Sequence, residues 1–202
     1  LSALIQFDLT PRHYFVIRNF RKDMRDSKWP TFSLAYRHAL PLEETGWSDY
    51  SMVELGIQHT IEVGLLSELE WSLGTGYFLD PGSIHFSDFK HFKSSPLIID
   101  MAGFDQALML MNYYEASTGE YWAEVQSTLT SSYLLVKFLP WFSERLWKES
   151  VRISYLYTPR IPHYLQLGYS LNEVFFLVDL GVYTAFQDWE YKGFGVRVNF
   201  RF

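Results

Sequence analysis

The chain has 202 residues, of which 48% are apolar and 19% aromatic, and the rings come from 14 Tyr, 17 Phe and 7 Trp. It contains no cysteine, which excludes disulfide scaffolds, thiol catalysis and zinc fingers. The formal charge of −6 argues against nucleic acid as a partner. No run approaches the roughly 18 uncharged apolar residues of a membrane-spanning helix. We expect one domain over residues 1–202 and no cofactor.

The first forty residues predict two or three β-strands. Side chains alternate along residues 3–9, with Ala3, Ile5, Phe7 and Leu9 on one side and Gln6 and Asp8 on the other. Because successive side chains of a strand point to opposite faces, this pattern predicts a two-faced strand. Further strands are predicted near residues 13–19 and 31–40.

Residues 50–63 and 67–77 show the clearest alternation and predict a hairpin. One side carries Val53, Leu55, Ile57, His59, Ile61 and Val63, followed after the turn by Leu69, Trp71, Leu73, Thr75 and Tyr77. The other side carries Glu54, Gly56, Gln58, Thr60 and Glu62, followed by Glu68, Glu70, Ser72, Gly74 and Gly76. A helix would scatter these charges around its axis.

Two segments do not alternate. Residues 78–105 are too long for a hairpin turn, and long irregular segments in compact domains are usually functional or folded inward, so we expect a plug or binding loop there. Residues 133–147 fit either a short amphipathic helix broken near Pro140 or a hydrophobic loop against the sheet rim.

The second half predicts further strands at about residues 106–116, 121–130, 151–158, 165–170, 178–186 and 194–202, which brings the total to about ten or eleven. Typical predicted strands have about 9 to 13 residues, the length that crosses a hydrocarbon layer at a tilt, whereas soluble strands average about 5 to 6. The fold class that we predict is therefore all-β, an antiparallel transmembrane β-barrel. A soluble sandwich or lipocalin-like binder is the alternative.

The last strand ends on an aromatic residue. Phe194, Val196, Val198, Phe200 and Phe202 alternate with small or charged residues up to the carboxyl end. Bacterial outer-membrane barrels usually end in this way. We expect Phe202, with Phe200, to act as an assembly signal that the barrel assembly machinery recognises by strand addition; the simpler reading is a last lipid-facing side chain.

Charged residues on the less apolar side of the strands are the predicted lumen charges of the barrel. They are Glu54, Glu62, Glu68, Glu70, Glu124, Arg152, Arg197 and Arg201, with Arg37 as a further member. In a narrow barrel such charges pair across the interior, and in a wide one they set solute selectivity.

Residues 83–91 hold the one group of catalytic residue types close together: Ser83, His85, Ser87, Asp88 and His91. A barrel hydrolase or acyltransferase would need a nucleophile, a base within hydrogen-bond reach and a group that orients the base. The simpler interpretation is a solvated loop, and His85 and His91 lack the i, i+4 spacing of helical zinc motifs. His59 lies on an apolar side, so a packing role is expected for it.

Several blocks resemble an uncharacterised family of outer-membrane barrels from the Bacteroidota, domain of unknown function 5686. The blocks are residues 27–32 (SKWPTF), 86–93 (FSDFKHFK), 111–115 (MNYYE), 119–121 (GEY), 138–140 (FLP), 157–164 (YTPRIPHY) and 171–175 (LNEVF). Longer members of that family carry a carboxypeptidase-regulatory-like domain ahead of the barrel. The resemblance implies the carboxy-terminal portion of an outer-membrane barrel and implies no activity.

We therefore expect an integral outer-membrane protein of a Gram-negative envelope, structural or transport-related. Its expected partners are outer-membrane lipid, the barrel assembly machinery and other proteins of an envelope complex. The alternative is an outer-membrane barrel enzyme that uses residues 83–91.

Overall fold

The computed structural model describes residues 2–12, 14–18, 20–25, 27–39, 48–100, 107–132, 134–138, 147–174 and 177–200. Within this part of the chain the structure is all-β, as predicted. It contains two 3-10 helices, η1 (Phe86–Asp88) and η2 (Val136–Phe138), and no α-helix. None of its helices is long and apolar enough to cross a membrane.

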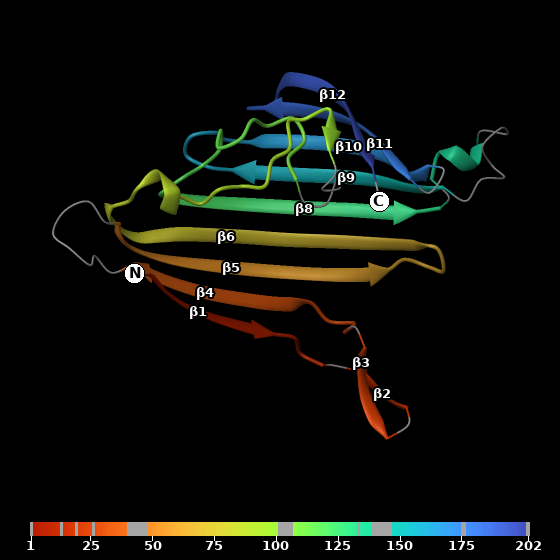
Figure 1. The fold of residues 1–202 in the computed structure, drawn as a ribbon, viewed down its shortest axis with the longest axis horizontal. Coiled ribbons are helices and arrows are strands. Elements are labelled where there is room, and N and C mark those ends of the chain that lie inside the picture. The colour runs from red at the N-terminus through yellow and green to blue at the C-terminus, as the bar shows by residue number, and fades with distance from the viewer. Residues whose placement is uncertain are drawn as a thin grey trace.

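Nine strands form one antiparallel sheet (Figure 1). In sheet order they are β1 (Ser2–Leu9), β4 (Thr31–Ala39), β5 (Asp49–Glu62), β6 (Ser67–Ser83), β8 (Tyr121–Ser131), β9 (Lys148–Tyr157), β10 (Tyr164–Val174), β11 (Val178–Gln187) and β12 (Glu190–Phe200). Among the described residues the sheet is open, with β1 at one edge. At the other edge the two-residue strand β7 (Ile99–Asp100) pairs with β12 in parallel orientation.

The register sorts the side chains into two faces, because cross-strand partners point to the same side. Glu54 pairs with Gly76 and Thr60 with Glu70, whereas Leu55 pairs with Thr75. The face that carries Glu54, Glu70, Trp122, Gln166 and Arg197 is called the inner face. The face that carries Leu55, Leu73, Val125, Leu167 and Val196 is called the outer face.

Residues 84–100 and 107–120, called the inner segment, lie between β6 and β8 in the sequence and cross the inner face over β8 to β12 (Figure 1, yellow to green). The segment packs on inner-face side chains from the end of the sheet where turn 158–163 lies as far as Arg197 and Val198 on β12. Three clusters of buried residues form there, one around Leu108, Met111, Leu156 and Tyr164, one around Tyr50, Met52, Phe78 and Trp122, and one of Ala107, Met109 and Tyr183. This part of the inner face is called the packed half.

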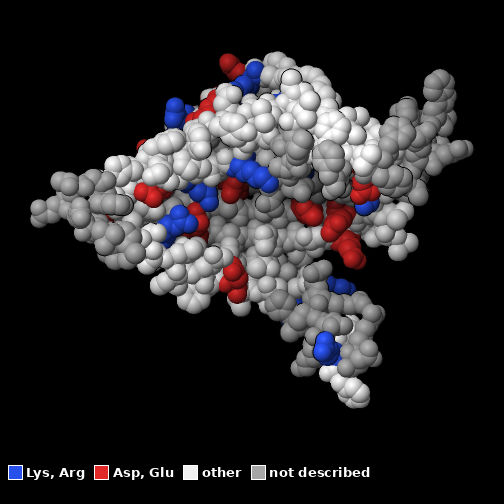
Figure 2. Space-filling view, viewed as in Figure 1, with Lys and Arg blue, Asp and Glu red and all other residues white. Residues whose placement is uncertain are grey.

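Toward the opposite end, where turn 63–66 lies, the inner face of β5 and β6 carries Glu62, Glu68 and Glu70. All three are exposed. Figure 2 shows acidic side chains gathered at this end of the hollowed face. We call this region the acidic half.

A second sheet stands apart from the first. Strands β2 (Tyr14–Arg18) and β3 (Arg21–Arg25) pair with each other and form a hairpin that projects beyond the end of β1 and the start of β4 (Figure 1). The sequence predicted a strand near residues 13–19 but missed β3, because its charged residues show no apolar alternation.

Two predictions of local structure were wrong. Residues 107–116 form no strand, since Ala107, Leu108 and Met109 are buried in succession and the stretch turns within the inner segment. Strand β6 continues to Ser83, beyond the predicted end at residue 77, because it stays paired with β5 through two register shifts.

A short helix or a hydrophobic loop was expected at residues 133–147, and the described part, residues 134–138 and 147, contains the 3-10 turn η2. The buried carboxylate of Glu149 accepts the backbone N–H groups of Leu134, Leu135 and Val136 at 2.9, 2.7 and 3.1 Å. The hydroxyl of Tyr169 donates to the same carboxylate at 2.7 Å. Hydrogen bonds to the Glu149 carboxylate therefore hold this turn in place. No sequence motif predicted this role of Glu149.

Candidate functional site on the inner face

The first anchor of the inner segment is an ion pair with β5. Lys90 Nζ lies 2.8 Å from Glu54 Oε1, and the same ammonium lies 5.1 Å from the ring centre of Trp122. Backbone hydrogen bonds between Lys90 and Thr118, at 2.9 and 3.2 Å, join the two arms of the segment. One cation thus fixes both arms against β5 and β8.

A second anchor lies over β10 and β12. The backbone N–H of Leu110 donates to Gln166 Oε1 at 3.1 Å, and Arg197 Nε donates to the carbonyl oxygen of Met109 at 3.1 Å. Arg197 Nη2 donates to the same carbonyl. These two hydrogen bonds from the buried Arg197 guanidinium attach the segment to β12.

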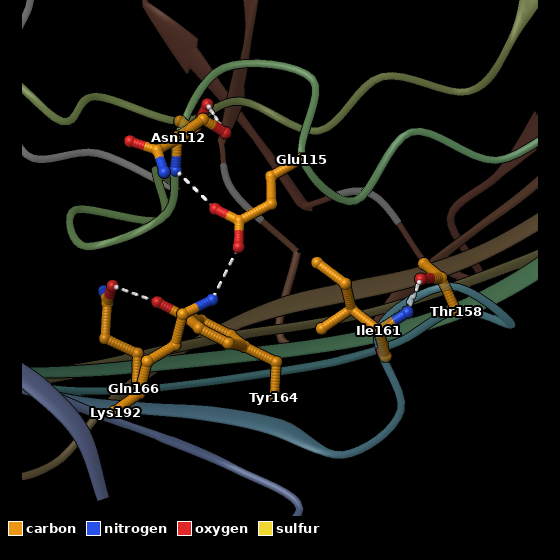
Figure 3. Close-up of polar contacts among 8 residues, drawn as sticks. Asn112, Glu115, Thr158, Ile161, Tyr164, Gln166 and Lys192 are labelled. Carbon is orange, nitrogen blue, oxygen red and sulfur yellow. Dashed lines mark hydrogen bonds and ion pairs between the residues drawn. The ribbon is translucent and has the colours of Figure 1, made fainter.

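The third anchor joins the segment to the start of β12 (Figure 3). Lys192 Nζ lies 2.7 Å from Glu115 Oε1, and the backbone N–H of Asn112 donates to Glu115 Oε2 at 3.0 Å. The Lys192 ammonium also lies 5.4 Å from the ring centre of Tyr164. Partial burial of the carboxyl opposes its ionisation, but the Lys192 ammonium and the Asn112 N–H outweigh burial, so the pKa of Glu115 is lowered.

Glycines let rings lie flat on the inner face. A Cβ at Gly76 would overlap the Trp122 ring, and one at Gly168 would overlap the ring of Tyr183. Both rings belong to the packed half. A side chain at either glycine would force the ring, and the segment above it, away from the sheet.

The register places the predicted lumen charges that the structure describes on one face. Glu54, Glu62, Glu68, Glu70, Glu124, Arg152 and Arg197 all lie on the inner face. Glu54 and Arg197 hold the inner segment, and Arg152 Nε donates to Thr128 Oγ1 at 3.2 Å. Arg201 lies outside the described residues, and the role of the set as lumen charges stays a prediction.

The predicted assembly signal is described in part. Phe202 lies outside the described residues. Phe200 pairs with Val178 at the end of β12, on the outer face. His59, also on the outer face, contacts Trp71 edge to face at 6.2 Å between ring centres, in line with the packing role expected for it.

The residues of the 83–91 group do not share one site, because Asp88 and His85 bond to Ser48 and His91 bonds to Ser117. Ser48 Oγ donates to Asp88 Oδ2 and accepts the backbone N–H of His85 at 3.0 Å. His91 Nδ1 shares a hydrogen bond with Ser117 Oγ at 2.8 Å. Ser83 ends β6 and Ser87 lies in η1. Sequence reasoning missed Ser48 and Ser117, which are 40 and 26 residues away from their partners.

A cavity of about 380 Å³ lies beside the His91–Ser117 pair, and its lining includes Ser117, Thr118, Glu120 and Arg160. The His91 ring contacts Phe86 and Tyr114 at 5.1 and 5.0 Å between ring centres. A serine and a histidine in hydrogen-bond contact at a cavity resemble part of a nucleophilic site. In the described part of the chain, no group of three His, Asp or Glu side chains could hold a metal ion.

Residues 1–171 match the model of a family of unknown function, DUF5686, in its C-terminal domain. The match covers β1 to most of β10 and leaves out β11 and β12. No curated protein and no solved structure matches the chain.

Proposed function

The chain belongs to the family of unknown function DUF5686, as its C-terminal domain, and on that premise we propose that it is an integral β-barrel protein of the outer membrane. Its role is structural or transport-related, within a larger complex of the cell envelope. Outer-membrane lipid surrounds its outer face, and the barrel assembly machinery inserts it.

The exposure of the two faces carries this proposal. Apolar side chains of the outer face are exposed, with Phe7 66%, Leu55 51% and Phe194 61% accessible, while Gln166 and Asn199 of the inner face are 1% and 2% accessible. A water-soluble domain buries its apolar face and exposes its polar one. A continuous apolar face over nine strands is the kind of surface that lipid covers.

Aromatic rings at both ends of the outer face support the same environment. Near turn 158–163 the rings of Tyr121, Tyr157, His163 and Trp189 form a chain of contacts, with centres 6.2, 5.3 and 6.0 Å apart. Trp71 lies toward the other end of the outer face. It is six residues from Tyr77 on the same strand, β6, and a rise of about 3.4 Å per residue puts the two about 20 Å apart. This spacing fits an apolar band about 25 Å tall between two aromatic girdles.

Strand length agrees with a bilayer. Strands β5 and β6 have 14 and 17 residues, more than the about 9 to 11 that cross a hydrocarbon layer and far more than a typical soluble strand. The inner segment packs on part of the inner face, and we propose that it restricts diffusion along that face. We therefore favour a structural role or gated transport over an open pore.

Membrane fractionation and heat modifiability test the proposal. We expect the protein in the outer-membrane fraction, soluble only with detergent, and migrating faster on gels before boiling than after it. Recovery of a folded monomer from the aqueous fraction without detergent would overturn the assignment.

Removal of Phe202 tests the assembly signal. We expect the deletion to reduce the folded protein in the outer-membrane fraction, because the machinery recognises an aromatic terminal strand. The matched control is Phe202→Tyr, which keeps the ring and is expected to retain normal levels. Equal amounts of folded protein for the deletion and the wild type would contradict the signal.

The second proposal is a barrel hydrolase in which Ser117 is the nucleophile and His91 the base, favoured by their 2.8 Å contact beside a cavity. A fluorophosphonate probe would label Ser117, and both Ser117→Ala and His91→Ala would abolish labelling. The control Ser87→Ala would leave it unchanged. Absence of labelling in the folded wild-type protein would remove this proposal.

A further inference from the structure

The β2–β3 hairpin exposes an apolar tip. Its strands pair only with each other among the described residues, with Ile17 opposite Lys22 and Arg18 opposite Arg21. Phe20 at the tip has a φ of 63° and is fully accessible, and Ile17 is 62% accessible. Exposed apolar side chains at the tip of a projecting hairpin indicate a surface that something else covers.

The same stretch carries the opposite charge to the rest of the chain. Residues 10–30 contain six Lys and Arg against two Asp, a net charge of +4, within a chain of net −6. The remaining residues therefore carry −10. Such segregation concentrates the attraction for anions in one projecting element.

The two segments that connect the hairpin to β1 and β4 contact each other. Ser27 Oγ donates to the carbonyl of Arg12 at 2.6 Å and accepts the N–H of Trp29 at 3.1 Å. Thr10 and Thr31, at the ends of β1 and β4, share a hydrogen bond at 2.9 Å. The Arg12 guanidinium lies over the Trp29 ring, 5.8 Å from its centre. These contacts hold residues 10–12 against residues 27–31, so the hairpin leaves the sheet at the end of β1 and β4, where turn 63–66 also lies.

We propose that this hairpin docks on the anionic, phosphate-bearing headgroups of the bilayer that surrounds the outer face. The inference rests on the proposed membrane location. The cations Arg12, Arg21 and Lys28 attract the phosphates, while Phe20 and Ile17 enter the boundary between headgroups and acyl chains. Trp29 lies at the interface, where an indole ring is stable. The hairpin thereby binds an otherwise acidic protein to an anionic surface.

A single label tests the docking, because the chain has no cysteine of its own. Phe20→Cys carries an environment-sensitive apolar fluorophore in place of the phenyl ring. The full chain is folded into vesicles of phosphatidylcholine alone or of phosphatidylcholine mixed with phosphatidylglycerol. The matched control is Leu65→Cys, a fully accessible position in the turn between β5 and β6, next to the acidic half.

We expect the label at residue 20 to shift to the blue with rising phosphatidylglycerol, and the label at residue 65 to stay unchanged. Arg21→Gln and Lys28→Gln on the Phe20→Cys background should each weaken the binding of the hairpin to the phosphatidylglycerol surface about fivefold, as read from the blue shift. Arg21→Lys keeps the charge and should leave this binding unchanged. Inorganic phosphate should not compete at constant ionic strength, which separates a lipid surface from a free-anion site.

The outcomes separate this inference from the proposed location. A protein that folds into both kinds of vesicle, yet shows the same spectrum at residue 20 in each, overturns the docking and leaves the membrane location standing. A blue shift that appears only when another envelope protein is added assigns the hairpin to a protein partner and also overturns it. A protein that inserts into neither vesicle contradicts the proposed function itself.

Discussion

The packed half and the acidic half of the inner face lie on the same strands but are stabilised differently. Strand β5 supplies Met52 to a buried cluster at one end and Glu62 to an exposed acidic group at the other. Strand alternation assigns both residues to the inner face, and it says nothing about what covers them. The inner segment makes the difference, because it contacts the β5–β6 hairpin around Met52, Glu54 and Phe78.

The largest expected effect is in the packed half. Leu156 is 1% accessible and contacts the cluster around Met111 and Tyr164. Leu156→Ala should lower the free energy of unfolding by about 2–5 kcal/mol, since it removes buried methyl groups and leaves a cavity. Urea titration of the protein refolded in vesicles measures the loss. Thr60→Ala, on the exposed end of β5, is the control and should change the value by less than about 0.5 kcal/mol; similar losses for both would erase the distinction between the halves.

Two glycines provide a sharper comparison. A Cβ at Gly168 would overlap the Tyr183 ring, whereas a Cβ at Gly193 on β12 would meet no atom within 4 Å. Gly168→Ala should therefore destabilise by about 1–3 kcal/mol through overpacking, and Gly193→Ala should be close to neutral. The same titration measures both. Equal stability of the two variants would show that the packed half does not need a glycine beneath the Tyr183 ring.

The Glu115–Lys192 pair should make a smaller, pH-dependent contribution. The pKa of Glu115 is lowered in the folded protein, so its stabilisation is complete above the ordinary carboxyl range and is lost as the pH falls through the folded pKa. Glu115→Gln should cost up to about 1 kcal/mol at neutral pH and flatten this part of the stability curve. Urea titrations between neutral and acidic pH measure both effects, and an unchanged slope in the variant would contradict the assignment.

The smallest effect is expected in the acidic half, and it has the opposite sign. Glu62 lies directly opposite Glu68 on the inner face, and like charges in such pairs destabilise a sheet. Glu68→Gln should raise the stability by at most about 0.5 kcal/mol, and the gain should shrink in high salt. A clear loss of stability would mean that the two carboxylates share a cation.

Side-chain alternation in the sequence predicted the strands, where the apolar pattern repeats every two residues. It assigned Glu54, Leu55 and their neighbours to the correct faces, because period two is a property of the strand itself. It failed for residues 107–116 of the inner segment, whose anchors depend on distant partners. Arg197 was predicted as a charged lumen residue, but its main partner is the backbone carbonyl of Met109, 88 residues away. Side-chain patterns do not encode such contacts, so residues 107–116 were misread as a strand.

The order of the sheet also sets a rule of parity. Eight antiparallel steps separate β1 from β12, so these two edge strands run in the same direction. A closed barrel in which all neighbouring strands are antiparallel needs an even number of strands. The nine described strands could join β1 directly to β12 only through a parallel seam; a fully antiparallel ring would take an odd number of further strands between them. In the fully antiparallel ring β7, which runs parallel to β12 and pairs with Val198 and Asn199, would have to leave that edge.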